Sequence, residues 1–188
     1  MAARTLARVL TDVLNPFAIF TALFLAVALA QSPLPRALLY TGVELLAAAA
    51  VAGYVLLMRR RARVGDFWIS TRAERRTPAL FLLTAFALLL GALWLLGAPE
   101  ELSLLTLSMG LASATVALLT LFVKASAHCT VAGHAAAAGL LLLGPLGVVF
   151  LLVLPLVIWA RVTLGAHTFL EALAGAVVGI GLAVLFLL

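Results

Sequence analysis

Long apolar runs occupy most of this chain of 188 residues, and three clusters of charged and polar residues stand out between them. Hydrophobic residues make up 66% of the sequence and charged residues 10%, and the mean hydropathy is +1.28. A soluble domain of this length cannot bury that much apolar surface in its core. The sequence therefore predicts an integral membrane protein and excludes a soluble globular fold.

A helix that crosses a bilayer needs about 20 predominantly apolar residues. On that basis we expect an all-α, polytopic transmembrane helix bundle of six to seven spans, forming a single domain over residues 1–188. The first run is expected to be a span rather than a cleaved signal peptide, because Gln31-Ser32-Pro33 offers no suitable cleavage site. The expected spans are Val13–Ala30, Ala37–Met58, Ala79–Leu96, Leu102–Val123, His128–Leu143, Leu146–Ala160 and His167–Leu188. In the last of these, Gly175-x-x-x-Gly179 is typical of closely packed helices.

Seven spans would bring all three polar clusters to one side of the membrane. The clusters are Asp66–Arg76, Lys124–His128 and Arg161–Glu171. Basic residues that the clusters do not need gather on that side, with Arg36 alone on the other; they are Arg4, Arg8, Arg59, Arg60, Arg61, Arg63 and Arg76. The positive-inside rule therefore predicts that the clusters face the cytoplasm, and we expect the membrane to be a prokaryotic inner membrane.

The Arg161–Glu171 cluster has the residues of a phosphoryl-transfer site. If the last helix begins near Gly165, His167 and Glu171 lie one turn apart on one face. The carboxylate can then hold the proton of one imidazole nitrogen, which leaves the other nitrogen nucleophilic. Arg161 offers a fork of donors suited to phosphate oxygens. The alternative is a histidine at a helix end with a chance acid nearby.

The Lys124–His128 cluster opens another helix, where unpaired N–H groups favour an anion. Lys124 adds a positive charge, Ser126 a hydroxyl and His128 a group that can donate a proton near neutral pH. An ordinary N-cap serine with an interfacial lysine would give the same pattern. In the loop Asp66–Pro78, Arg72 and Arg75 can clamp a phosphate, or they can serve only to orient the protein in the membrane.

Two further polar residues lie inside expected spans, and we interpret Glu44 and His134 as satisfied structural groups. The metalloprotease pattern H-E-x-x-H is absent from the sequence, and no cluster of carboxylates suggests a magnesium site. We expect neither a metal nor another cofactor, and no nucleic acid partner. The sequence leaves the oligomeric state open.

In their order, the clusters resemble the three signatures of the type 2 phosphatidic acid phosphatase superfamily. Its third signature, S-R-x5-H-x3-D, matches Arg161, His167 and Glu171 in spacing, with Ala160 in place of Ser and Glu in place of Asp. The second, P-S-G-H, is reduced to Ser126-Ala127-His128. The first, K-x6-R-P, is represented by Arg72 and Arg75 without the expected Lys. The resemblance covers a core of about residues 66–188.

The resemblance implies a metal-independent membrane phosphatase. His167 would attack phosphorus and form a phosphohistidine, Glu171 would orient His167, and His128 would protonate the leaving oxygen. The phosphoryl oxygens would be held by Arg72, Arg75, Lys124, Ser126 and Arg161. The expected substrate is a membrane lipid phosphate such as an isoprenyl (di)phosphate, phosphatidic acid or phosphatidylglycerol phosphate. Two alternatives remain, an anion or lipid transporter and a catalytically dead membrane protein of the same fold.

Overall fold

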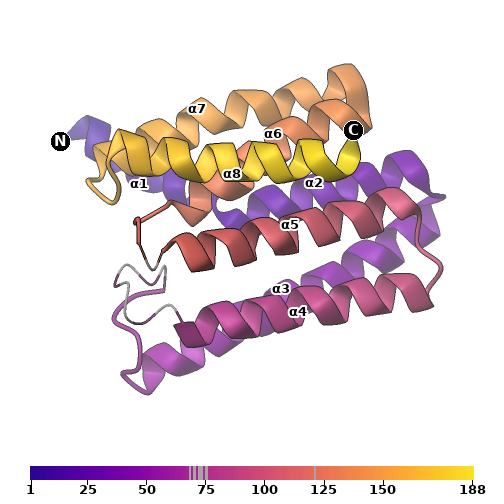
Figure 1. Cartoon of the computed structure of the whole chain (residues 1–188), viewed down its shortest axis with the longest axis horizontal. Coiled ribbons are helices and arrows are strands. Elements are labelled where there is room, and N and C mark those ends of the chain that lie inside the picture. Colours follow the sequence, from indigo (N-terminus) through magenta and orange to yellow (C-terminus); the bar gives the residue numbers. More distant parts are fainter. Residues whose placement is uncertain (68, 70, 72–73, 75, 121) are drawn as a thin grey trace.

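The computed structural model of the chain is an elongated bundle of antiparallel helices (Figure 1). It describes residues 1–67, 69, 71, 74, 76–120 and 122–188. The structure is 84% helical and has no strand among these residues. The helices are α1 (Ala2–Val13), α2 (Pro16–Gln31), α3 (Leu34–Arg60), α4 (Arg76–Leu95), α5 (Glu100–Leu119), α6 (Ala127–Leu143), the 3₁₀ turn η2 (Gly144–Gly147), α7 (Val148–Thr163) and α8 (Phe169–Leu187).

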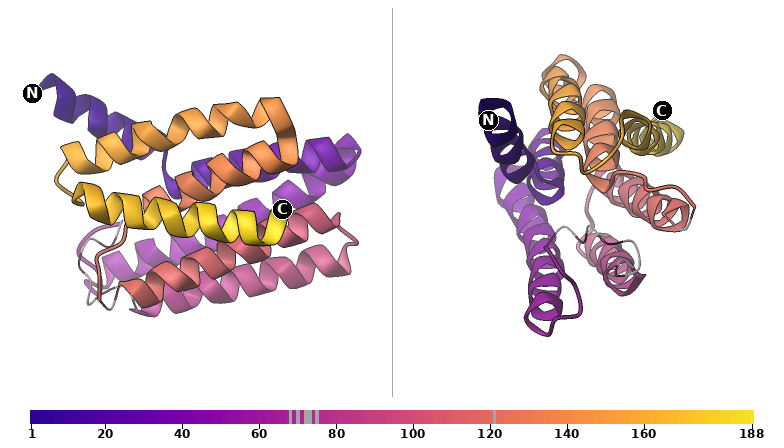
Figure 2. Two further views of the ribbon diagram at one scale, coloured as in Figure 1. Left: turned by 45° about the horizontal axis from the view of Figure 1, so that its top comes forward. Right: turned by 90° about the vertical axis from the view of Figure 1, so that its left-hand side faces the viewer.

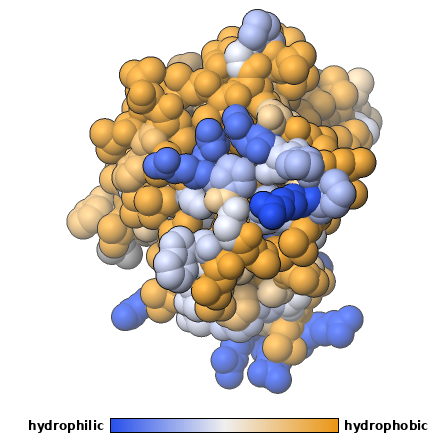
Figure 3. Space-filling view, turned by 90° about the vertical axis from the view of Figure 1, so that its right-hand side faces the viewer, coloured by the Kyte–Doolittle hydropathy of each residue, from blue (hydrophilic) through white to orange (hydrophobic). Residues whose placement is uncertain are grey.

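The helices α2 to α8 run back and forth along the bundle, so their connections alternate between its two ends (Figure 1). The connections α5–α6 and α7–α8, and the described residues between α3 and α4, lie at the end where α1 begins. The sequence predicted this convergence of the three polar loops. At the opposite end, a small polar patch surrounded by apolar surface is visible (Figure 3), and Arg36 and Glu100 are exposed there.

The protein has several helices that are long and apolar enough to cross a membrane. By length and composition the described residues give five such segments: Leu34–Arg60, Arg76–Leu95, Glu100–Leu119, Ala127–Thr163 and Phe169–Leu187. A sixth is obtained if α1 and α2, which are bent by 48°, form one span. The upper expectation of seven spans is therefore not met.

The number of spans is lower than expected because Ala127–Thr163, where two spans were expected, gives one membrane-crossing segment by length and composition. Within this segment η2 reverses the direction of the chain between α6 and α7. These helices have 17 and 16 residues. At about 1.5 Å per residue they reach roughly 25 Å, which is short for a hydrocarbon core of about 30 Å.

The start of the chain also differs from the expected single span Val13–Ala30. The helix α2 begins only at Pro16, where the Asn15 side chain caps it by accepting a hydrogen bond from the Ala18 N–H at 3.0 Å. The preceding residues form a separate helix, α1, which packs against α7. A residue with a capping side chain followed by proline is a common helix start, so this boundary could have been predicted.

At the centre of the bundle, α6 is surrounded by α2, α5, α7 and α8 (Figure 2). It packs most closely against α8 because glycines line the contact. A Cβ atom at Gly179 would lie 2.7 Å from the His134 backbone nitrogen, and one at Gly133 would lie 3.0 Å from the Ala176 Cα. The expected close-packing role of the Gly175-x-x-x-Gly179 pattern is confirmed.

Two buried polar pairs join helices away from the loops. The Ser108 hydroxyl and the His134 Nε2 atom lie 2.8 Å apart and link α5 to α6. The Thr21 hydroxyl lies 3.0 Å from both carboxyl oxygens of Glu44 and links α2 to α3. The contact of Glu44 agrees with its interpretation as a satisfied structural group. His134 is satisfied only at Nε2, because its buried Nδ1 atom has no hydrogen-bond partner among the described residues.

Candidate functional site

The loop before α6 ends in a helix cap. Ser126 is the N-cap residue: its hydroxyl accepts a hydrogen bond from the Cys129 N–H at 3.4 Å, and its carbonyl accepts one from the Thr130 hydroxyl at 3.0 Å. Ser126 is fully buried. The cap fixes the direction in which Lys124 and Ala125 leave the helix, and it places His128 in the first turn.

The end of α7 is shaped by a Schellman motif. Gly165 has a φ of +69°, its N–H bonds to the Val162 carbonyl at 2.9 Å, and the Ala166 N–H bonds to the Arg161 carbonyl at 3.1 Å. Glycine suits this left-handed position because it has no Cβ atom. The motif turns the chain back sharply, so that His167 lies one short loop away from Arg161.

The helix α8 begins two residues later than expected, at Phe169, because Thr168 and Glu171 form a capping box. The Thr168 N–H donates to the Glu171 carboxylate at 2.9 Å, and the Glu171 N–H donates to the Thr168 hydroxyl at 3.3 Å. His167 therefore precedes the helix instead of lying within it. Its Nδ1 atom is still 3.6 Å from the Glu171 carboxylate.

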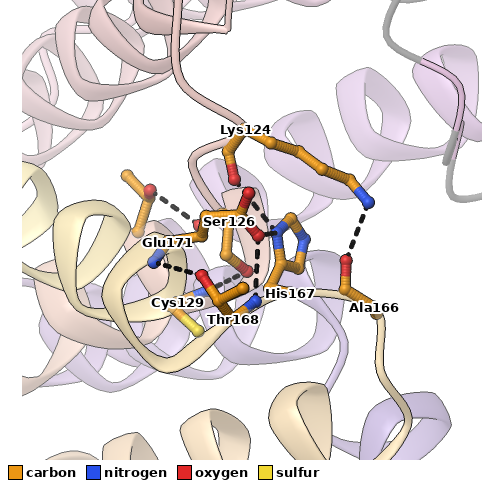
Figure 4. A network of polar contacts seen from close by, with 8 residues as sticks. Lys124, Ser126, Cys129, Ala166, His167, Thr168 and Glu171 are labelled. Atoms are coloured by element: carbon orange, nitrogen blue, oxygen red, sulfur yellow. Dashed lines mark hydrogen bonds and ion pairs between the residues drawn. The ribbon is translucent and has the colours of Figure 1, made fainter.

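Hydrogen bonds join the loop before α6 to the end of the α7–α8 loop and to the first turn of α8 (Figure 4). The Lys124 ammonium donates to the Ala166 carbonyl at 2.9 Å. The His167 Nδ1 atom lies 3.1 Å from the Lys124 carbonyl, and the Ser126 N–H donates to the Glu171 carbonyl at 3.2 Å. The second and third polar clusters of the sequence thus form one site.

The contact between His167 and the Lys124 carbonyl determines the tautomer of the imidazole. A carbonyl oxygen can only accept a hydrogen bond, so the Nδ1 atom must carry the proton. In the neutral ring the lone pair then lies on Nε2. Glu171 was expected to orient the ring from its place in the sequence, but the nearer acceptor is the Lys124 carbonyl at 3.1 Å, and the Glu171 carboxylate lies at 3.6 Å.

Arg161 and His128 belong to the same cluster. Both residues are buried, as is His167, and none of the three is more than 8% exposed. The Arg161 carbonyl accepts a hydrogen bond from the His167 N–H at 3.4 Å, and His128 lies in the first turn of α6, two residues after the cap Ser126. Arg161 and Lys124 bring positive charge to this end of the bundle, and their side chains are chemically suited to a phosphate or another oxyanion.

Arg72 and Arg75, the remaining predicted phosphate ligands, lie outside the described residues. Among their described neighbours, the Glu74 carboxylate accepts a hydrogen bond from the Gly65 N–H at 2.9 Å. Arg76 is the first residue of α4 and is exposed, and Pro78 is buried in the first turn.

In the described part of the chain, no group of three or more His, Cys, Asp and Glu side chains is arranged to hold a metal ion.

Two apolar furrows open on the outside of the bundle. One, of about 270 Å³, lies between α3 and α4, and the other, of about 750 Å³, lies mainly between α2 and α3. Neither furrow is lined by a residue of the cluster around His167.

Two features of the site escaped sequence reasoning. The Lys124 carbonyl is a backbone group, so no residue type signals its role. The Thr168 cap, in contrast, has a readable signal, because Thr-x-x-Glu before an apolar run is the pattern of a capping box.

Comparison of the chain with family models, curated proteins and solved structures finds no match.

Proposed function

We propose that the protein is a metal-independent phosphatase that acts on a membrane lipid phosphate through a phosphohistidine on His167. The observation that carries the proposal is the 3.1 Å contact of the His167 Nδ1 atom with the Lys124 carbonyl. It assigns the lone pair to Nε2, which is the state that a nucleophilic imidazole needs. The spacing of Arg161, His167 and Glu171 supports the same proposal through the resemblance to type 2 phosphatidic acid phosphatases.

In the proposed reaction the His167 Nε2 atom attacks phosphorus, so that a P–N bond forms as the P–O bond to the lipid breaks. His128 gives a proton to the departing lipid oxygen. Water then attacks the phosphohistidine, the P–N bond breaks, phosphate leaves, and His128 takes up the proton that water loses. Arg161 and Lys124 offset the charge on the phosphoryl oxygens, together with Ser126 and, by resemblance, Arg72 and Arg75.

The proposed substrates are lipids with an exposed phosphate, namely an isoprenyl (di)phosphate, phosphatidic acid or phosphatidylglycerol phosphate. The polar cluster lies at one end of an apolar bundle, where a phosphate headgroup would meet the protein while its tail stays in the bilayer. The distribution of arginines supports a cytoplasmic position for this end, and we propose that the substrate is a lipid made on that side.

A second candidate role, a catalytically inactive structural cluster, is favoured by how fully the polar groups engage one another. The Lys124 ammonium is bound to the Ala166 carbonyl, and the Glu171 carboxylate caps α8. The first contact would hold the two loops together and the second would fix the start of α8, in both cases without any chemistry. An anion transporter, the third candidate, would bind phosphate at the same cations without cleaving an ester.

Release of inorganic phosphate from a lipid phosphate by the purified protein in detergent, with EDTA present, separates the proposed phosphatase from the other two roles. The proposal predicts turnover that EDTA leaves unchanged and that His167→Ala abolishes. A structural protein or a transporter would release no phosphate. Activity that EDTA removes and zinc or magnesium restores would contradict the mechanism.

A further inference from the structure

We propose that α1 is an amphipathic helix that lies in the membrane–water interface and binds anionic phospholipid headgroups through Arg4 and Arg8. This inference does not depend on the proposed phosphatase activity. It rests on how the polar, apolar and buried residues of α1 are distributed around the helix. At 100° per residue, three different faces can be distinguished.

The first face of α1 is charged. Arg4, Arg8 and Asp12 are spaced four residues apart, so they form a row along one side of the helix, and all three are exposed. Within this row the charge is positive at Arg4 and Arg8 and negative only at Asp12. The row is therefore complementary to an anionic surface over its first two turns.

The second face is apolar and also exposed. Leu6 is 53% exposed, Val9 52% and Val13 62%. In water such a row of large aliphatic side chains would be unfavourable. It is accounted for if this face is embedded in the acyl chain boundary of the bilayer while the charged row stays among the headgroups.

The third face attaches α1 to the protein. Ala7 and Thr11 are buried, and α1 packs against α7. These two residues lie between the charged row and the apolar row around the helix. The protein therefore covers only the narrow strip that separates the faces, and it leaves the charged row on one side and the apolar row on the other.

The position of α1 also fits an interfacial helix. It begins at the end of the bundle that carries the polar loops (Figure 1), and it meets α2 at an angle of 48°. The residues Ala2–Gln31 would extend about 45 Å as a continuous helix, which exceeds a hydrocarbon core of about 30 Å. The bend lets α1 leave the direction of the spans where the charged residues begin.

Spin labels on α1 test this inference in vesicles. Labels attached at Val9→Cys and at Arg8→Cys report the apolar and the charged face, and the parent chain is the blank because its one cysteine, Cys129, is buried. In phosphatidylcholine vesicles we expect oxygen to relax the Val9 label more than a water-soluble nickel chelate does, and the reverse for the Arg8 label. Equal exposure of both labels to the nickel chelate, or shielding of both, would overturn the proposal.

The charge dependence is tested with the Val9 label alone. Replacing part of the phosphatidylcholine by phosphatidylglycerol should move this label deeper. The double variant Arg4→Gln/Arg8→Gln should lose that response, whereas Arg4→Lys/Arg8→Lys should keep it. As a matched control, Arg59→Gln/Arg60→Gln removes two exposed charges from the end of α3 and should leave the response intact. A response that survives in Arg4→Gln/Arg8→Gln would show that these arginines do not bind the headgroups.

Discussion

At the scale of single residues, two groups contact the His167 ring and have different effects on it. The Lys124 carbonyl fixes the proton on Nδ1, and the Glu171 carboxylate lies close enough to stabilise a positive charge on the ring. Glu171 also caps α8 together with Thr168. Its electrostatic and structural contributions can therefore be separated by choosing the substitution.

Glu171→Gln should lower the rate without lowering stability, because Gln also completes a capping box. The Lys124 carbonyl still selects the tautomer, so we expect a loss of about tenfold, equivalent to about 1.4 kcal/mol. Thr168→Ala should do the reverse and cost about 0.5–2 kcal/mol of stability through loss of the cap. Thermal unfolding and phosphate release measured on both variants check this. A large loss of stability in Glu171→Gln would show that the charge itself is structural.

His128→Ala should slow the reaction in proportion to how poor the leaving group is. General acid assistance is worth about 10²–10⁴-fold for an alkoxide, and p-nitrophenolate leaves without much help from a proton. A series of phosphate esters with leaving groups of graded basicity measures the effect. If the defect is equally large across the series, His128 does not act as the general acid.

The sequence predicted that the loops carrying Lys124, Ser126, Arg161, His167 and Glu171 would meet at one face, because the count of apolar spans brought these polar clusters to the same side. It did not predict that the ring would be held by a backbone carbonyl. Main-chain groups are the same in every residue, so only the path of the chain brings them into position. Arg72 and Arg75 lie outside the described residues, and their part in the site stays a prediction.

At the scale of elements, the contact between α6 and α8 holds the two loops in register. Gly175 lies against the Ser126 carbonyl and the Thr130 hydroxyl, so its lack of a side chain lets α8 approach the start of α6. Gly179 makes a similar approach one turn further on, against Thr130 and His134. The distance between the two polar clusters is thus set by small residues outside the site.

Gly179→Ala should push α8 away from α6, because the new Cβ atom would meet backbone atoms that cannot rotate aside. We expect a loss of about 1–3 kcal/mol from overpacking and a fall in activity. Gly181→Ala is the matched control, since nothing lies within 4 Å of its Cβ position, and its stability should stay within about 0.5 kcal/mol of the parent. Unfolding in detergent compares the two. Equal effects would contradict the close contact at Gly179.

The apolar runs in the sequence predicted the positions of most helices, but they predicted the ends of the helices less accurately. The expected run Leu102–Val123 became Glu100–Leu119, and α1 was not recognised as a separate helix. Hydropathy averages over a window, whereas helix ends are decided by single caps such as Asn15 and Thr168. The amphipathic pattern of Arg4, Arg8 and Asp12 was readable, but the adjoining apolar run concealed it.

At the scale of the whole molecule, the protein is an apolar bundle with its catalytic candidates and most of its arginines at one end. The loop after α3 should be cytoplasmic for this reason. An impermeant thiol reagent applied to intact cells should leave Ala62→Cys unlabelled and should label Gln31→Cys, which is exposed at the opposite end. The reverse pattern would place the site outside and remove the preference for a lipid made in the cytoplasm.

The most direct test of the central claim is to trap the phosphoenzyme with a lipid phosphate labelled with radioactive phosphorus. The proposed mechanism predicts a protein-bound label that is stable in alkali, labile in acid and located on the peptide containing His167. His167→Asn keeps an N–H donor for the Lys124 carbonyl but has no nucleophilic nitrogen, so it should fold and carry no label. Phosphate release without any trapped label, or a label that persists in His167→Asn, would contradict the assignment of His167 as the nucleophile.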